Sequence, residues 1–194
     1  IGTAATDAEA SNPSTGLATA DDTTGTDDED LTMPTVSPGL STSFTIPVTL
    51  SGSVANGRLM VWADWNGDNA VSGTNEVVTG TGGVAAPVSL VAGTNNAAVT
   101  FTPPANTTLG TKYVRFVVIE GTTTPVFNGA SGLKGEVEDY AITVALHSGC
   151  DYGDLPDTSA GTGAGNYKTV QSDSGAAHLI VSGLLLGTTV DGEL

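Results

Sequence analysis

The sequence predicts an all-β protein, and three observations lead to that prediction. The apolar residues are mostly Val, Ala, Leu and Ile, and 26 Gly with many Thr supply the residues of tight turns. Short segments alternate between apolar and polar residues with the period of a strand. The middle of the chain shows no convincing helical period.

The first strand is predicted where Phe44, Ile46, Val48 and Leu50 share one face. Pro47 interrupts this segment, and a proline has no N–H to give to a neighbouring strand. We therefore expect an edge strand or a bulge here.

Three further strands are expected at Leu59–Trp65, Val88–Val91 and Ala97–Phe101, with Gly93–Asn95 as turn residues between the last two. Tyr113–Ile119 gives the strongest strand signal. The last strand is predicted from three alternating apolar residues, Tyr140, Ile142 and Val144.

Short strands at this spacing, with turns between them, favour an antiparallel β-sandwich, either Ig-like or jelly-roll-like. The sequence divides into a polar, acidic segment (residues 1–40), the predicted sandwich (41–146) and a Gly/Ser/Asp-rich segment (147–194) that would link to, or begin, the next repeat. The two outer segments are long, acidic and rich in Gly and Thr.

The charge of the chain limits its partners. Five Lys and Arg stand against 21 Asp and Glu, for a formal net charge of −16. We expect no nucleic-acid partner, because phosphate binding needs a basic surface, and no membrane insertion, because no apolar run is long enough. Cys150 is the only cysteine, so bound metal rather than a disulfide would give added rigidity.

The clearest candidate site is the loop that contains Asp64, Asn66 and Asp68, followed by Glu76. Side-chain oxygens at alternate positions around a Gly turn can surround one hard cation, so we expect calcium here. The spacing resembles the start of an EF-hand, but Glu76 falls one residue late and the loop follows a strand. The alternative is an Asp/Asn/Gly hairpin turn without metal.

Two other acidic clusters are candidate metal segments. Asp27, Asp28 and Asp30 belong to one acidic run, which a solvated acidic linker would explain equally well. Asp151 and Asp154 lie in a Gly/Pro loop that also reads as a turn-rich linker.

Asp139 is a further candidate ligand, at the start of the last strand. Side chains alternate between the two faces of a strand, so Glu136 and Glu138 lie on one face and Val137 and Asp139 on the other. We expect Asp139 on the side of the core, partly buried, with backbone donors or a metal as its partner.

Catalysis is not expected. Only two histidines are present, neither in a recognisable nucleophile setting, and ten aromatic residues are few for lining a deep sugar cleft. Trp62 and Trp65 are interpreted as core and turn-packing residues.

The two ends of the chain resemble each other weakly. Residues 1–9 (IGTAATDAE) match residues 186–193 (LGTTVDGE) with one insertion, as expected if the chain runs from inside one repeat to the same point in the next. An apolar cluster at 179–186 would either fold back onto its own sandwich or pair with a neighbouring unit.

The motifs ADDTTGTDDED, VWADWNGDN, KGEVEDYAITV, DYGDLPDT and HLIVSGLLLGTTVDGE occur in this order. Together they resemble the GEVED-type repeat module of bacterial secreted and cell-surface, adhesin-like proteins. The resemblance implies a β-sandwich, an extracellular location and no known catalytic residues. Leu31 and Asn69 depart from it, because a Gly is usual at both places.

The sequence therefore predicts a non-catalytic, calcium-stabilised structural or adhesive repeat of a large extracellular protein or fibre. Its expected partners are neighbouring repeats or identical subunits arranged head to tail, and possibly glycans or other surface proteins. The alternatives are a calcium-dependent carbohydrate-binding module and, less favoured, a carbohydrate-active enzyme domain.

Overall fold

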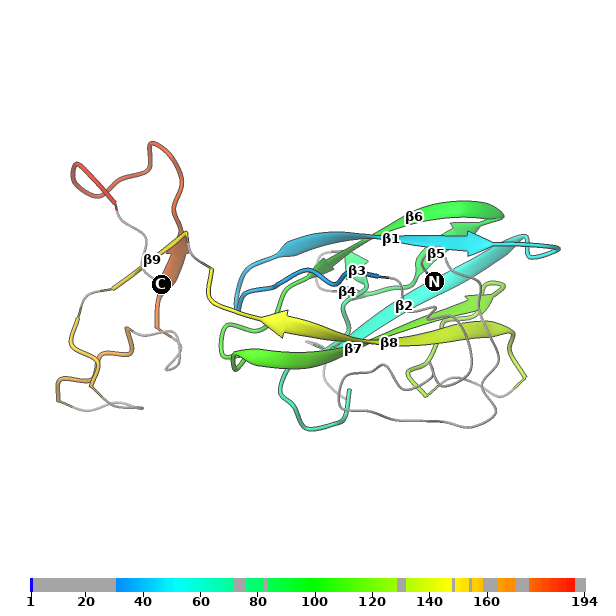
Figure 1. Ribbon diagram of the computed structural model, residues 1–194, viewed down its shortest axis with the longest axis horizontal. Helices are drawn as coiled ribbons and strands as arrows, with labels where there is room; N and C mark the ends of the chain where they lie inside the picture. The colour runs from blue at the N-terminus through cyan, green and yellow to red at the C-terminus, as the bar shows by residue number, and fades with distance from the viewer. Residues whose placement is uncertain are drawn as a thin grey trace.

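The computed structural model describes residues 1, 31–71, 76–81, 84–128, 132–147, 149–153, 155–158, 164–169 and 175–190. Within these residues the secondary structure consists of antiparallel strands and contains no helix, which confirms an all-β sandwich (Figure 1). None of this described part has a helix that could cross a membrane.

Two sheets form the sandwich. The smaller sheet pairs β1 (Thr42–Leu50) with β6 (Gly93–Phe101). The larger sheet has the order β5 (Val88–Val91), β2 (Asn56–Asp64), β7 (Gly110–Glu120) and β8 (Gly135–Val144). There are also two small two-stranded sheets. One pairs β3 (Gly80–Thr81) with β4 (Val84–Ala85), and the other pairs β9 (Cys150–Tyr152) with β10 (Ala177–Leu179).

The core lies between the two sheets, and strand alternation supplies it. Ile46 and Val48 of β1 are buried against residues of the larger sheet such as Phe116 and Ile142. The predicted apolar faces of these strands are therefore confirmed. Among the described residues β1 pairs only with β6, so Pro47 lies in an edge strand there, as its missing N–H requires.

Residues before β1 also join this core. Val36 forms a parallel bridge with Val144, and its N–H donates to the Thr143 carbonyl at 2.9 Å. The side chain of Val36 is 1% exposed, and that of Ile1 is 6% exposed. The sandwich core thus includes two residues from the segment that precedes residue 41 in the sequence.

A second apolar cluster lies on the other face of the larger sheet. It contains Met60 and Trp62 from β2 with Val117 and Ile119 from β7, and Phe127 from the following loop packs against it. These two strands therefore bury residues on both faces, which accounts for their nearly continuous apolar stretches.

The turn between β5 and β6 is shorter than the sequence predicts. Gly93–Asn95 begins β6 instead of forming a loop, and the chain turns around Ala92. The Asn95 side chain stabilises this turn, because its amide donates to the carbonyls of Val91 and Gly93 and its oxygen accepts the Val91 N–H. A short polar side chain here replaces the loop backbone as a hydrogen-bond partner.

The region from β9 onwards lies beyond the end of the sandwich at which β8 finishes (Figure 1). Cys150 is buried within it, while the apolar residues that follow β10 are largely exposed. Val181 is 53% exposed, Leu184 is 76% exposed and Leu186 is fully exposed. The expected apolar cluster is therefore present, and the structure leaves it uncovered by the described part of its own chain.

Candidate metal centre

The centre is assembled at the end of β2. Asp64 is the last residue of this strand, and the chain then turns away and returns as residues 76–78 along the edge of β2. The Ala63 N–H donates to the Glu76 carbonyl at 2.8 Å, and the Val78 N–H donates to the Val61 carbonyl at 2.8 Å. These backbone bonds bring Glu76 back beside Asp64.

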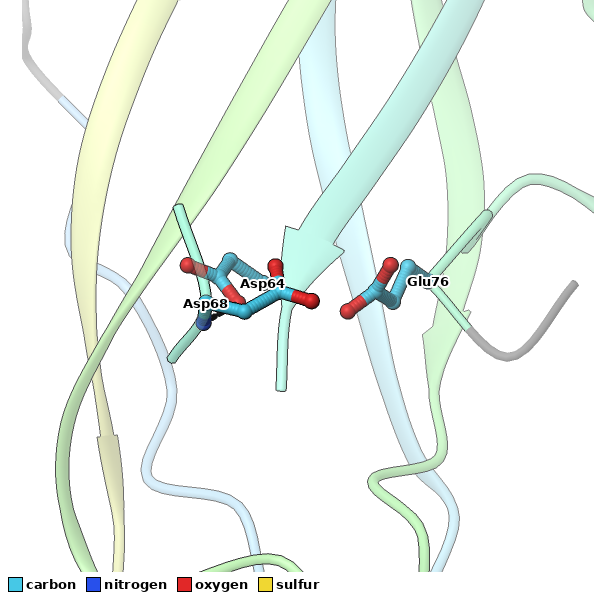
Figure 2. A group of neighbouring side chains, drawn as sticks. All are labelled: Asp64, Asp68 and Glu76. Atoms are coloured by element: carbon cyan, nitrogen blue, oxygen red, sulfur yellow. Dashed lines mark hydrogen bonds between the residues drawn. The ribbon is translucent and has the colours of Figure 1, made fainter. Parts of the chain in front are cut away.

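The three carboxylates converge. Asp64, Asp68 and Glu76 each offer a ligand oxygen, and these oxygens all lie within 4.8 Å of one another, as Figure 2 shows. Calcium binds its oxygen ligands at 2.3–2.6 Å, so two ligands of one ion are at most about 5 Å apart. One calcium ion can therefore contact all three side chains.

The loop itself is ordered by the Asp64 carboxylate. Its Oδ1 accepts the N–H groups of Gly67 at 2.8 Å and Asp68 at 3.2 Å, and its Oδ2 accepts the Asn69 N–H at 3.0 Å. Gly67 and Asn69 have positive φ values of 76° and 62°. Asparagine tolerates this conformation, so it can stand at a position where the resembling repeats carry Gly.

Asn66 supports Asp68. Its side-chain oxygen accepts the Asp68 N–H at 2.8 Å, and its amide nitrogen donates to Asp68 Oδ2 at 2.9 Å. The Ala70 N–H donates to the other oxygen, Oδ1, at 2.8 Å. The second carboxylate is thus held in a fixed orientation at the surface.

These bonds also fit the simpler interpretation of an Asp/Asn/Gly turn, which explains Asp64, Asn66 and Asp68. They do not explain Glu76. Its side chain is only 5% exposed, although it lies beside two other carboxylates. Burying a charge next to like charges is unfavourable unless a cation compensates, so the residues present fit a divalent hard cation.

One basic residue lies near the loop. Lys112 of β7 is 8% exposed, and its ammonium donates to Thr108 Oγ1 at 2.8 Å. A Cβ atom placed on Gly67 would lie 3.7 Å from Lys112 Nζ, so this ammonium lies close to the loop. Its charge opposes a cation in the centre and partly balances the carboxylates without one.

The expectation that Asp139 faces the core was wrong. Glu138 is 3% exposed and Val137 is 51% exposed, so the Glu residues of this strand face inward and Asp139 faces outward. Asp139 is partly buried, as expected, and the partner that the structure gives it is a guanidinium. Arg115, directly opposite in β7, donates from Nε at 2.7 Å and Nη2 at 2.5 Å to its two oxygens.

Of the remaining candidate ligands, Asp27, Asp28, Asp30 and Asp154 lie outside the described residues. Asp151 lies in β9, opposite His178 of β10, in the region beyond the sandwich.

Sequence reasoning missed two features of the sandwich. The first is Lys112, which comes from a distant strand and has no local signal. The second is Arg115, whose guanidinium carbon lies 4.5 Å from the centre of the Phe127 ring and whose pKa is raised mainly by its hydrogen bonds to Asp139. Trp62 and Trp65 are 6% and 3% exposed, which confirms them as packing residues.

Comparison with known families gives one match. Residues 58–143, less than half of the 194 residues, match the GEVED domain. The matched part contains all of the metal-centre residues, the whole of β5 to β7, and β8 up to Thr143. No curated protein and no solved structure matches the chain.

Proposed function

We propose, with the GEVED match over residues 58–143 as the premise, that this chain is a calcium-stabilised structural or adhesive repeat of a large extracellular protein or fibre. The proposal includes a bacterial secreted or cell-surface origin and a non-catalytic role. The observation that carries it is the convergence of Asp64, Asp68 and the buried Glu76 on one point.

In this proposal Asp64, Asp68 and Glu76 hold the ion. Calcium supplies a crosslink between the end of β2 and the returning segment 76–78, which are separated by a long loop in the sequence. Asp64 already accepts three backbone N–H groups, so it is positioned as a fixed ligand and not as a group that exchanges protons with a substrate. A fixed crosslink of this kind suits a load-bearing module.

The exposed apolar residues after β10 support contacts with neighbouring repeats or identical subunits. The alternative role, a calcium-dependent carbohydrate-binding module, required Trp62 or Trp65 to touch a ligand. Both indoles are buried, so the structural role is favoured.

The test is thermal unfolding of the full chain in chelator and in millimolar calcium. A site filled at a hundredfold excess over its Kd stabilises by about 2.7 kcal/mol, which for a chain of this size corresponds to a melting shift of several degrees. Asp68→Ala should remove most of the shift, whereas Glu120→Ala, at a surface carboxylate of β7, should leave it unchanged. Superimposable curves for the unsubstituted chain would overturn the calcium proposal.

A further inference from the structure

The charged groups around the candidate metal centre include a cation of the chain itself. The three carboxylates of Asp64, Asp68 and Glu76 carry a charge of −3 when ionised, and the Lys112 ammonium brings +1 into the same region. The four groups together carry −2, which is the charge that one divalent cation neutralises. Lys112 therefore bears on how strongly the centre binds a cation and on which cation it binds.

The fold holds Lys112 beside the loop of the centre. β2 ends at Asp64, opposite Tyr113, so Lys112 lies one residue beyond the end of β2. Lys112 is only 8% exposed, and its ammonium donates to Thr108 Oγ1 at 2.8 Å. A hydroxyl is neutral, so this hydrogen bond orders the ammonium without neutralising it.

The ammonium lies close enough to act on an ion in the centre. The Gly67 N–H donates to Asp64 Oδ1 at 2.8 Å, and a Cβ atom on Gly67 would lie 3.7 Å from Lys112 Nζ. Nζ is therefore at most about 9 Å from that carboxylate oxygen. The Debye length at 0.1 M salt is about 10 Å, and buried charges are screened less than exposed ones. Ordinary salt thus leaves the repulsion between Lys112 and a bound cation in place.

Arg115, the other basic residue of β7, has its charge compensated by a carboxylate. Its guanidinium donates to both oxygens of Asp139, at 2.7 Å from Nε and at 2.5 Å from Nη2. Arg115 pairs with Trp62, so this ion pair also lies further along β2 from the loop than Lys112 does. Lys112 is accordingly the basic residue of β7 whose charge acts on the centre.

We propose that Lys112 sets the affinity and the charge selectivity of the metal centre. Without a cation, the ammonium offsets part of the repulsion among the three carboxylates, and it repels a cation that binds there. The centre therefore binds calcium more weakly than its carboxylates alone would, and it disfavours a trivalent ion, which the ammonium repels more strongly. This inference rests on the calcium centre of the proposed function and names the residue that regulates it.

The test is calcium titration of the full chain and of three variants at about 0.1 M salt. Lys112→Met removes the charge and keeps a long side chain, whereas Lys112→Arg keeps the charge. Charges of +1 and +2 at about 11 Å repel in water by enough to change an affinity about threefold, and by more at a lower dielectric constant. We therefore expect Lys112→Met to bind calcium at least about threefold more tightly and Lys112→Arg to bind it like the unsubstituted chain.

Lys134→Met is the matched control for net charge. It removes the same charge at an exposed lysine next to the start of β8, about 20 Å along the strands from the centre. At this distance salt screens the interaction between exposed charges, so calcium affinity should not change.

Terbium supplies a second readout because its ion is trivalent. Tyr113 lies directly opposite Asp64 in the strand register and can transfer excitation energy to a bound terbium ion, whose luminescence then reports occupancy. Coulomb repulsion grows with the charge of the ion, so Lys112→Met should tighten terbium binding more than calcium binding. A lysine that only packed against the loop would not change the ratio of the two affinities.

If Lys112→Met does not fold, Lys112→Gln, whose amide can still donate to Thr108 Oγ1, takes its place. The inference alone is overturned if the neutral variant binds calcium equally or more weakly, if the ratio of terbium to calcium affinity is unchanged, or if Lys112→Arg or Lys134→Met gains as much. If neither the unsubstituted chain nor any variant binds calcium, the calcium proposal fails and this inference fails with it. Binding by the neutral variant alone would support the inference and contradict the calcium proposal.

Discussion

The substitution Glu76→Gln separates a metal centre from a simple turn, because its effect on stability should change sign with calcium. Glu76 is buried, and its carboxylate lies within 4.8 Å of oxygens from both Asp64 and Asp68. Without a cation, removing its charge relieves repulsion. With calcium bound, the same substitution removes a charged ligand.

The size of the effect follows from the geometry. Two unit charges 4.8 Å apart repel by about 0.9 kcal/mol in water and by about 3.5 kcal/mol at an effective dielectric constant of 20. Asp68 is exposed, so the value for water applies to its pair with Glu76, and the Asp64 pair lies between the two limits. Because the nearby Lys112 ammonium offsets part of this repulsion, we expect Glu76→Gln to stabilise the calcium-free chain by at most about 2 kcal/mol.

In calcium at a hundredfold excess over Kd, the unsubstituted chain gains about 2.7 kcal/mol and the variant gains much less, so the order of stability reverses. Urea unfolding of both chains in chelator and in calcium measures this. Glu120→Gln, at a surface Glu that lies 3.7 Å from Lys134, is the control and should show no calcium-dependent effect. A Glu76→Gln chain that is destabilised equally in both conditions would refute the metal interpretation.

Three further predictions concern the scaffold. Gly135→Ala should destabilise the chain by more than about 2 kcal/mol in urea unfolding, because its Cβ would lie 2.2 Å from the Val118 carbonyl oxygen; a loss below 0.5 kcal/mol on the same scale would contradict the packing described. Arg115→Met should lower stability by about 1–3 kcal/mol because it leaves the partly buried Asp139 without its guanidinium, and Arg115→Lys should recover only part of this loss. Burial raises the pKa of the Cys150 thiol, so its thiolate is scarcer than that of free cysteine at any given pH, and maleimide labelling of the folded chain should accelerate at a higher pH than labelling of free cysteine. A labelling profile that coincides with that of free cysteine would contradict the burial of this residue.

Much of the sandwich could be predicted from the sequence because its strands are local patterns. The alternation at Phe44–Leu50 and Val114–Val118 reports directly which side chains face the core. The error at Asp139 shows the limit of local reasoning. Glu136 and Glu138 have the same parity as Tyr140, Ile142 and Val144, and this parity alone places them inward; the expectation followed the chemical character of Val137 instead.

A buried glutamate on an inward face was not foreseen, because a charged side chain at a core position is unfavourable unless it has a partner. Glu138 accepts a hydrogen bond from the Tyr140 hydroxyl at 3.2 Å, within its own strand. Arg115 reaches Asp139 only because β7 and β8 pair in one register, and no spacing in the sequence encodes that register. Pairings of this kind are properties of the sheet, not of either strand alone.

The candidate metal centre likewise combines residues that a local pattern reveals with residues that only strand pairing brings in. Asp64, Asn66 and Asp68 could be found from the sequence because a single turn contains them, while Glu76 depends on the backbone pairing of residues 76–78 with β2. Lys112 could not be found, because it comes from a strand paired through its neighbour Tyr113 with Asp64. Its ammonium lies close to the loop, where its charge would offset part of the repulsion among the carboxylates.

The strand registers also fix where this centre lies in the sandwich. Asp64 pairs with Tyr113, and Tyr113 pairs with Ala141, so the centre is at the end of the sandwich where β8 finishes. That is the end from which the chain continues to the exposed Leu186. A cation at Asp64 would therefore act on the end of the sandwich that leads to the exposed apolar segment.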